Sequence, residues 1–89
     1  MDVEEAIVLK YVDGETAPRV VAKGRRLTAL RIQELAEKHG VKIVENPPLV
    51  KTLISLPIGE FIPEETYKVV AEILLYIYNI EDEFQRNRR

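Results

Sequence analysis

The chain has 89 residues, of which 46% are hydrophobic and 31% charged, a balance typical of one folded domain, 1–89, and not of a disordered chain. It contains no cysteine, which excludes a disulfide framework, a thiolate nucleophile and cysteine-ligated zinc. A net charge of -2 excludes the overall positive field that attracts nucleic acid or anionic lipid, so such binding needs a local patch. The N-terminus is acidic and no apolar run is long enough for a membrane span, which predicts a cytoplasmic protein.

Two strands joined as a hairpin are predicted at the start of the chain. Residues 6–12 are a continuous aliphatic run, and residues 19–23 resume strand composition after a segment rich in turn-forming residues. The next element is a helix at 25–39 that ends at Gly40, and a third strand is predicted at 41–45. Because a helical crossover favours parallel strands, 41–45 is expected beside 19–23 in a mixed sheet.

Two further helices are predicted after the third strand. Residues 47–54 repeat apolar side chains at helical spacing, with Asn46 as the N-cap and proline in the first turn. The last helix, 63–80, opens at Pro63 with acidic residues in its first turn. The prediction is therefore an α/β (α+β) fold, a small three-stranded mixed sheet packed by three helices, with residues 1–5 and 81–89 as flexible ends.

The last helix carries two apolar stripes. The first comprises Tyr67, Val70, Ala71, Leu74 and Tyr78. The second comprises Val69, Ile73, Ile77 and Ile80. A helix that is apolar on two faces is either covered on both or keeps one face for a partner.

No constellation of residues predicts catalysis or a cofactor. His39 is the only histidine and Ser55 the only serine, and they fall in different predicted helices, which disfavours a catalytic triad. His39 is more simply a residue of the last helical turn. The acidic run at 81–83 is consecutive, so its carboxylates cannot converge on one ion from a helix, and it is expected to be a solvated face. We predict no enzyme, metal or cofactor site.

Four basic residues lie around the junction between the second strand and the first helix: Lys23, Arg25, Arg26 and Arg31. Helix N-termini attract anions, so a phosphate or nucleic-acid site is one interpretation of this cluster. No aromatic residue is nearby to stack on a base, which favours a solvated basic edge. A protein-docking role for the same residues remains open.

Several sequence blocks, taken in order, resemble the C-terminal cytoplasmic domain of the FlhB/YscU family, the export switch proteins of flagellar and type III secretion systems. The two most specific are APRVVAKG at 17–24 and VENPPL at 44–49. The others are AIVLKY at 6–11, ALRI at 29–32, IPEETY at 62–67 and VAE at 70–72. The resemblance extends from about residue 6 to residue 78.

The resemblance implies a self-cleaving Asn-Pro-Thr-His tetrapeptide just before the first strand, but the matching positions here are Met1-Asp2-Val3-Glu4. The nucleophilic amide, the proline and the histidine are all replaced, so self-cleavage is not expected. The chain thus resembles a free-standing copy of the family's cleaved C-terminal fragment, without its membrane domain. The family strand before the tetrapeptide would also be missing, which predicts an exposed sheet edge covered by a second copy, by a partner strand or by residues 1–5.

The family also implies a hydrophobic patch that recognises export substrates. The matching positions are Ala17 and Pro18 before the second strand, with Ala71 and Leu74 on the last helix. For Ala71 and Leu74, packing in the core is an equally good interpretation. The resulting hypothesis is a non-catalytic interaction module of the export apparatus, which binds export substrates, the export gate protein or the membrane-anchored switch protein. The alternative is a small anion- or nucleic-acid-binding protein.

Overall fold

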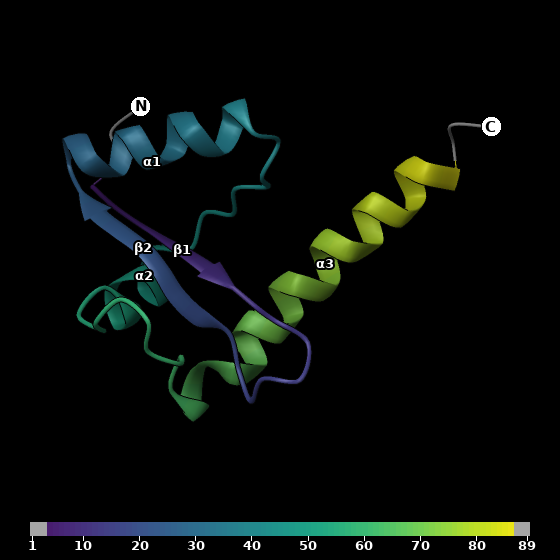
Figure 1. Cartoon of the computed structure of the whole chain (residues 1–89). Coiled ribbons are helices and arrows are strands. Elements are labelled where there is room, and N and C mark those ends of the chain that lie inside the picture. The colour runs from purple at the N-terminus through teal and green to yellow at the C-terminus, as the bar shows by residue number, and fades with distance from the viewer. Residues whose placement is uncertain (1–3, 87–89) are drawn as a thin grey trace.

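The computed structural model of the chain is an α+β fold in which a β-hairpin is combined with three helices (Figure 1). It describes the backbone of residues 4–86 and the side chains of residues 4–79. The elements in chain order are β1 (Glu5–Lys10), β2 (Arg19–Arg25), α1 (Leu27–Lys38), α2 (Pro47–Leu53), the 3₁₀-helix η1 (Glu64–Thr66) and α3 (Tyr67–Arg86). The predicted fold class, the hairpin and the three helices are confirmed. Three predicted bounds are wrong, because β1 ends at Lys10, β2 continues to Arg25 and α1 begins only at Leu27.

The hairpin forms a two-stranded antiparallel sheet, in register from Glu5 opposite Arg25 to Lys10 opposite Arg19. A bulge between Val8 and Leu9 shifts the register by one residue. Glu5 was predicted to belong to a flexible end, but it begins β1, and its carboxylate lies 3.1 Å from Nε of Arg25.

The predicted third strand at 41–45 is wrong. This segment has no regular secondary structure, and three of its apolar side chains are well exposed: Val41 (54%), Ile43 (47%) and Val44 (40%). Residues 41–45 have the composition of a strand, but they do not pair with another strand. The sheet is therefore antiparallel and not mixed.

The second edge of β2 is bonded instead by residues 59–62. The backbone N–H of Val20 donates to the carbonyl of Glu60 (2.9 Å), and the N–H of Gly59 donates to the carbonyl of Val20 (2.7 Å). Phe61 forms an isolated antiparallel bridge with Arg19. This short segment therefore protects the start of β2 in place of the predicted strand, and dimerisation through a sheet edge stays a prediction.

The junction between β2 and α1 is tightly packed. A Cβ on Gly24 would press against Cγ2 of Thr28 and lie 2.7 Å from its Cβ, so glycine is required for the helix to approach the strand this closely. Arg26 follows with φ 54°, ψ -118°, a conformation that L-residues rarely adopt. The sharp change of direction packs α1 against the hairpin, and Ala29 of α1 is fully buried.

The ends of α1 and α2 follow the predicted capping chemistry. His39 is the C-cap of α1, its N–H donating to the carbonyl of Leu35 (3.0 Å), and Gly40 adopts φ 71°. The side-chain oxygen of Asn46 accepts a hydrogen bond from the N–H of Leu49 (3.2 Å) at the start of α2.

The last helix is longer than predicted. Its start is confirmed, since Pro63 precedes η1 with Glu64 and Glu65 in the first turn. Its predicted end at residue 80 is wrong, because α3 continues to Arg86. Residues 81–86, predicted to be part of a flexible end, are therefore helical, and 87–89 lie outside the described residues, as do 1–3.

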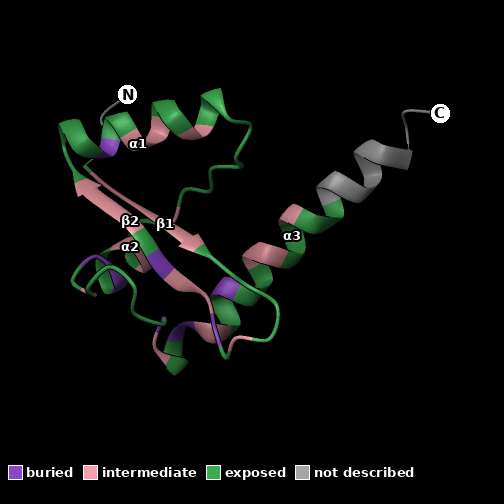
Figure 2. Cartoon of the chain, viewed as in Figure 1, coloured by how far each residue is buried: buried purple, intermediate pink, exposed green. Residues whose placement is uncertain are grey.

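The core lies where the hairpin, α2 and the first turns of α3 meet. Its buried cluster comprises Ala17, Leu53, Ile62 and Val70, with Ile7 and Leu9 of β1 packed against it. In Figure 2 most of the buried positions gather at this end of the molecule, and one further buried position lies in α1. The Cα radius of gyration, 13.7 Å, exceeds the roughly 12 Å expected for 89 residues because α3 projects from the rest of the fold.

Candidate functional site

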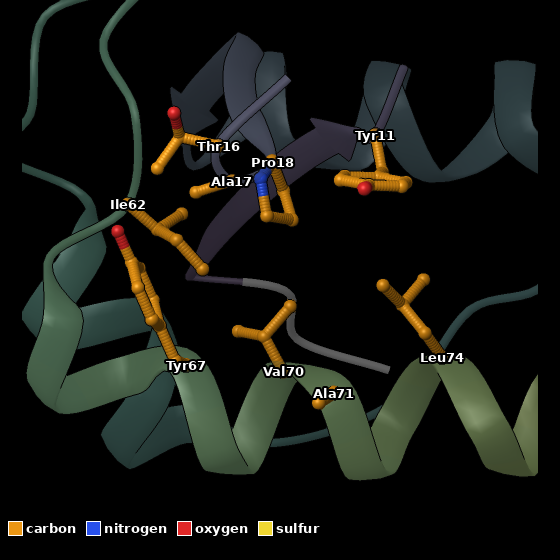
Figure 3. A pocket seen from close by; sticks show the side chains of 9 residues that line it. All are labelled: Tyr11, Thr16, Ala17, Pro18, Ile62, Tyr67, Val70, Ala71 and Leu74. Carbon is orange, nitrogen blue, oxygen red and sulfur yellow. The ribbon is translucent and has the colours of Figure 1, made fainter. Parts of the chain in front are cut away.

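An open apolar pocket lies between the β1–β2 connection and the first turns of α3 (Figure 3). Its volume is ≈ 270 Å³. Nine residues line it: Tyr11, Thr16, Ala17, Pro18, Ile62, Tyr67, Val70, Ala71 and Leu74. This volume lies just below the roughly 300–1,000 Å³ range of small-molecule sites, and it suits one or two side chains better than a cofactor.

Three segments that are distant in sequence build the walls of this pocket. The β1–β2 connection supplies one wall, α3 supplies the opposite wall, and Ile62 lies between them (Figure 3). A hydrogen bond from the N–H of Ile62 to the carbonyl of Pro18 (3.0 Å) joins the first wall to the segment that leads into α3. The spacing of three and four residues along α3 then places Tyr67, Val70, Ala71 and Leu74 on one face of the helix.

All four residues of the predicted docking patch line this pocket. Ala17 is almost fully buried and Pro18 is half-buried, whereas Ala71 is exposed and Leu74 half-buried. Packing in the core, the competing interpretation, is disfavoured for Ala71 because it is accessible. Leu74 packs against the core cluster as well as lining the pocket, so both interpretations apply to it.

Five of the lining residues were not predicted: Tyr11, Thr16, Ile62, Tyr67 and Val70. Tyr67 and Val70 belong to the first apolar stripe of the last helix. Because they share this face with Ala71 and Leu74, the stripe could have predicted that they line the same pocket. Tyr11, Thr16 and Ile62 come from irregular segments, in which no periodicity shows which way a side chain points.

The pocket is lined mainly by apolar side chains. The polar groups of its lining side chains are the hydroxyls of Tyr11, Thr16 and Tyr67. None of the nine lining side chains is a carboxylate, an imidazole or an amine, the groups that usually act as general acid or base near neutral pH. The pocket can therefore bury an apolar group and leaves a few hydroxyls free to orient it.

The predicted basic cluster is divided by the fold. Nζ of Lys23 donates to the carbonyls of Ile54 (2.9 Å) and Leu56 (2.7 Å), so this ammonium is bonded to the end of α2. Arg25 forms the ion pair with Glu5. The remaining two residues, Arg26 and Arg31, are exposed at the start of α1.

The other residues considered from the sequence take no part in the pocket. His39 caps α1, and Ser55 is exposed after α2. Among the side chains described, His, Asp and Glu nowhere gather in a group of three that could hold a metal ion. Over the residues described, none of the helices has both the length and the apolar character needed to cross a membrane.

A comparison with protein families decides what this fold and pocket belong to. The model of the FlhB HrpN YscU SpaS family matches residues 3–77. The chain belongs to this family. The match includes both walls of the pocket, since Tyr11 and Leu74 lie within it. The family resemblance seen in the sequence blocks is thereby confirmed.

Members of the FlhB HrpN YscU SpaS family with related sequences include long and short proteins. The flagellar biosynthetic protein FlhB of Bacillus subtilis (strain 168) is 47% identical over 75 residues, which are 82% of this chain and 21% of that protein. FlhB of Salmonella typhimurium is 40% identical over 78 residues, 85% of this chain and 20% of that protein. The chain thus spans about a fifth of the length of these FlhB proteins. The uncharacterized protein YlqH of B. subtilis is 38% identical over 88 residues, 98% of this chain and 94% of YlqH.

Solved structures of the family share the fold. The cytoplasmic domain of FlhB from Shewanella putrefaciens superposes with a TM-score of 0.84 at 32% identity, covering 94% of this chain and 69% of that one. The PscU C-terminal domain gives a TM-score of 0.77 at 28% identity, covering 83% of this chain and 96% of that one. The two-stranded α+β arrangement described above is therefore a version of the C-terminal domain of this family.

Proposed function

We propose that the chain is a non-catalytic protein-interaction module of the flagellar or type III protein-export apparatus, working on the cytoplasmic side of the membrane. Its apolar pocket docks a short segment of an export substrate. One observation carries the proposal: Ala17 and Pro18 form one open apolar pocket with Ala71 and Leu74, although more than fifty residues separate the two pairs. These are the positions at which the family resemblance implies substrate recognition.

The size and chemistry of the pocket favour weak, reversible binding. Apolar burial contributes about 25 cal/mol per Å², and one large side chain buries roughly 150–250 Å², so the gross gain is about 4–6 kcal/mol. Loss of rigid-body freedom and ordering of the segment offset much of that gain. A dissociation constant in the millimolar range or weaker follows, which suits a substrate that must be released for export.

Binding of nucleic acid or other anions is less well supported than peptide docking. Lys23 uses its ammonium on two backbone carbonyls, and Arg25 is paired with Glu5. Because these two cations already have partners, an anion site at this junction would depend mainly on Arg26 and Arg31. Steep loss of RNA or DNA retention with rising salt would nevertheless favour this function over docking.

A matched pair of α3 variants tests docking. Ala71→Glu places a carboxylate in the pocket wall, whereas Asn79→Glu adds the same charge at an exposed position of α3 outside the pocket. Both positions are accessible, so both variants should fold. Peptides from early export substrates, titrated while amide chemical shifts are monitored by NMR, should bind the parent protein and Asn79→Glu. The proposal requires at least a tenfold loss of affinity for Ala71→Glu, and equal binding by both variants would refute it.

Cellular export provides the second test. The chain is expressed in bacteria whose membrane-anchored switch protein ends before the corresponding C-terminal region, and secretion of an early substrate is measured. Restored secretion by the parent chain, lost with Ala71→Glu and kept with Asn79→Glu, supports the proposal. Co-purification with the truncated switch protein or with the export gate protein identifies the partner. Absence of both rescue and co-purification contradicts a role in the apparatus.

A further inference from the structure

One guanidinium connects three segments behind the pocket. Nε and Nη2 of Arg19 lie 2.9 and 2.7 Å from Oε2 of Glu15, in the β1–β2 connection. Nη1 donates to the carbonyl of Gly59 (2.8 Å), and the guanidinium carbon lies 4.0 Å from the centre of the Phe61 ring. Arg19 thereby joins the connection, the start of β2 and the segment 59–62.

The segments that Arg19 joins carry pocket residues. Glu15 immediately precedes Thr16 and Ala17 of one wall, and Phe61 immediately precedes Ile62 between the walls. Between residues 12 and 16, the described hydrogen bonds are the turn bond from the N–H of Glu15 to the carbonyl of Val12 (3.0 Å) and those from Arg19 to Glu15. The turn bond is internal, so Arg19 is what attaches this part of the connection to the rest of the fold.

The electrostatics of this contact agree with its geometry. The hydrogen bond that Arg19 donates to Glu15 raises the pKa of Arg19 above its ordinary value. Burial acts against this rise, and the negative charges of Glu15 and Glu60 add to it. A planar guanidinium can direct three N–H groups at two acceptors while its face covers an aromatic ring. The ammonium of lysine is a point charge and cannot hold all three partners in this arrangement.

We propose that Arg19 is a positioning residue of the pocket: through Glu15 it fixes the Thr16 end of the first wall relative to Ile62 and α3. The other two residues of this wall are held independently, Ala17 by the core and Pro18 by its hydrogen bond with Ile62. Arg19 does not line the pocket and does not touch the bound segment. It sets the distance between the two walls, and therefore which apolar side chains fit between them. The consequence for peptide binding rests on the proposed function, whereas the consequence for the order of the wall does not.

The experiment compares Arg19→Lys with Arg25→Lys by amide hydrogen exchange and NMR chemical shifts. Arg25 is the matched control, because it is also an arginine of β2 with a glutamate partner but lies at the far end of the strand. In Arg19→Lys, exchange at the amide of Glu15, which is hydrogen-bonded to the carbonyl of Val12, should accelerate about tenfold, which corresponds to the loss of one charge-assisted hydrogen bond. Exchange in α1 and the methyl shifts of Ala29 should stay unchanged.

Two outcomes would overturn the proposal. One is unchanged exchange at the amide of Glu15 in Arg19→Lys. The other is a uniform acceleration in all elements, which would make Arg19 a general stabilising residue with no specific effect on the wall. Neither outcome depends on a ligand, so failure of the proposed function leaves this test intact.

Peptide titration adds the functional measurement. The substrate peptides that bind the parent protein should bind Arg19→Lys about three- to tenfold more weakly, with a changed preference between aromatic and aliphatic side chains, and should bind Arg25→Lys normally. A looser wall with unchanged affinity and preference would contradict the effect on specificity. If no peptide binds even the parent protein, the proposed function fails, and the exchange experiment alone decides the role of Arg19.

Discussion

Nζ of Lys23 lies 2.7 Å from the carbonyl oxygen of Leu56, just beyond the C-terminus of α2. The same ammonium also bonds the carbonyl of Ile54, two residues earlier. The last carbonyls of a helix have no partner within the helix, and a cation at this end is favoured by the helix dipole. Lys23, which the sequence grouped with three arginines in a basic cluster, therefore fixes α2 to the hairpin.

Replacing this lysine should reduce stability. Lys23→Met keeps most of the aliphatic length and removes the ammonium donor, so the carbonyls of Ile54 and Leu56 lose their hydrogen bonds to it. The free energy of unfolding should fall by about 1–3 kcal/mol, measured by urea denaturation. Arg31→Met is the control, because Arg31 is exposed on α1 and its loss should change stability by less than about 0.5 kcal/mol. Equal small effects at both positions would contradict the structural role of Lys23.

The close approach at Gly24 predicts a steric penalty. Gly24→Ala should destabilise the protein by about 1–3 kcal/mol, because the new methyl group meets the side chain of Thr28. Thr28→Ser removes Cγ2 but keeps Cβ, so the double variant should regain part of the loss and no more. The four proteins of this double-mutant cycle can be compared by thermal unfolding. Additive effects would show that the two residues do not conflict.

The backbone of Arg26 predicts the opposite result, a stabilising substitution. Its φ of 54° is unfavourable for a side chain with a Cβ but accessible to glycine. Arg26→Gly should therefore raise stability by about 1 kcal/mol, which is roughly 4–8 °C in Tm for a domain of this size. Arg26→Ala, which keeps the Cβ, serves as the control and should give no gain. A lower Tm for the glycine variant would show that the arginine side chain has a stabilising contact.

The charge at position 19 predicts how stability depends on pH. Because the pKa of Arg19 is raised in the folded protein, its contribution is complete at lower pH and is lost only as pH rises through that raised pKa, beyond the range in which the protein is handled. In Arg19→Lys the titrating group has an ordinary pKa of about 10.4, so the stabilisation should be lost from about pH 10 upward. The measurement is the difference in Tm between variant and parent from pH 7 to 11, which should widen at the alkaline end. A constant difference would mean that the charge of residue 19 contributes nothing.

The sequence predicted the parts of the fold that depend on local chemistry. Asn46 and Gly40 were placed correctly at helix ends because capping is decided by a few neighbouring residues. The segment 41–45 was misassigned because strand composition says nothing about whether a pairing partner is available. Its place beside β2 is taken by 59–62, a segment bounded by proline and glycine that carries no strand pattern.

The candidate site was predictable to the same extent. The stripe of α3 gave the wall formed by Tyr67, Val70, Ala71 and Leu74, because helical periodicity fixes which residues share a face. The opposite wall came from the family resemblance of Ala17 and Pro18. Neither source could reveal Arg19, whose partners are four, forty and forty-two residues away and are brought together only by the tertiary fold.

The projection of α3 has a mechanical consequence. Its first two turns form a wall of the pocket, while residues 75–86 continue for about 18 Å beyond it. A helix bends little over such a length, so it acts as a lever whose short arm is the pocket wall. A small sideways force on the distal arm would change the width of the pocket without any contact inside it. A contact at the far end of α3 would therefore alter the affinity of the pocket for the segment that it is proposed to bind.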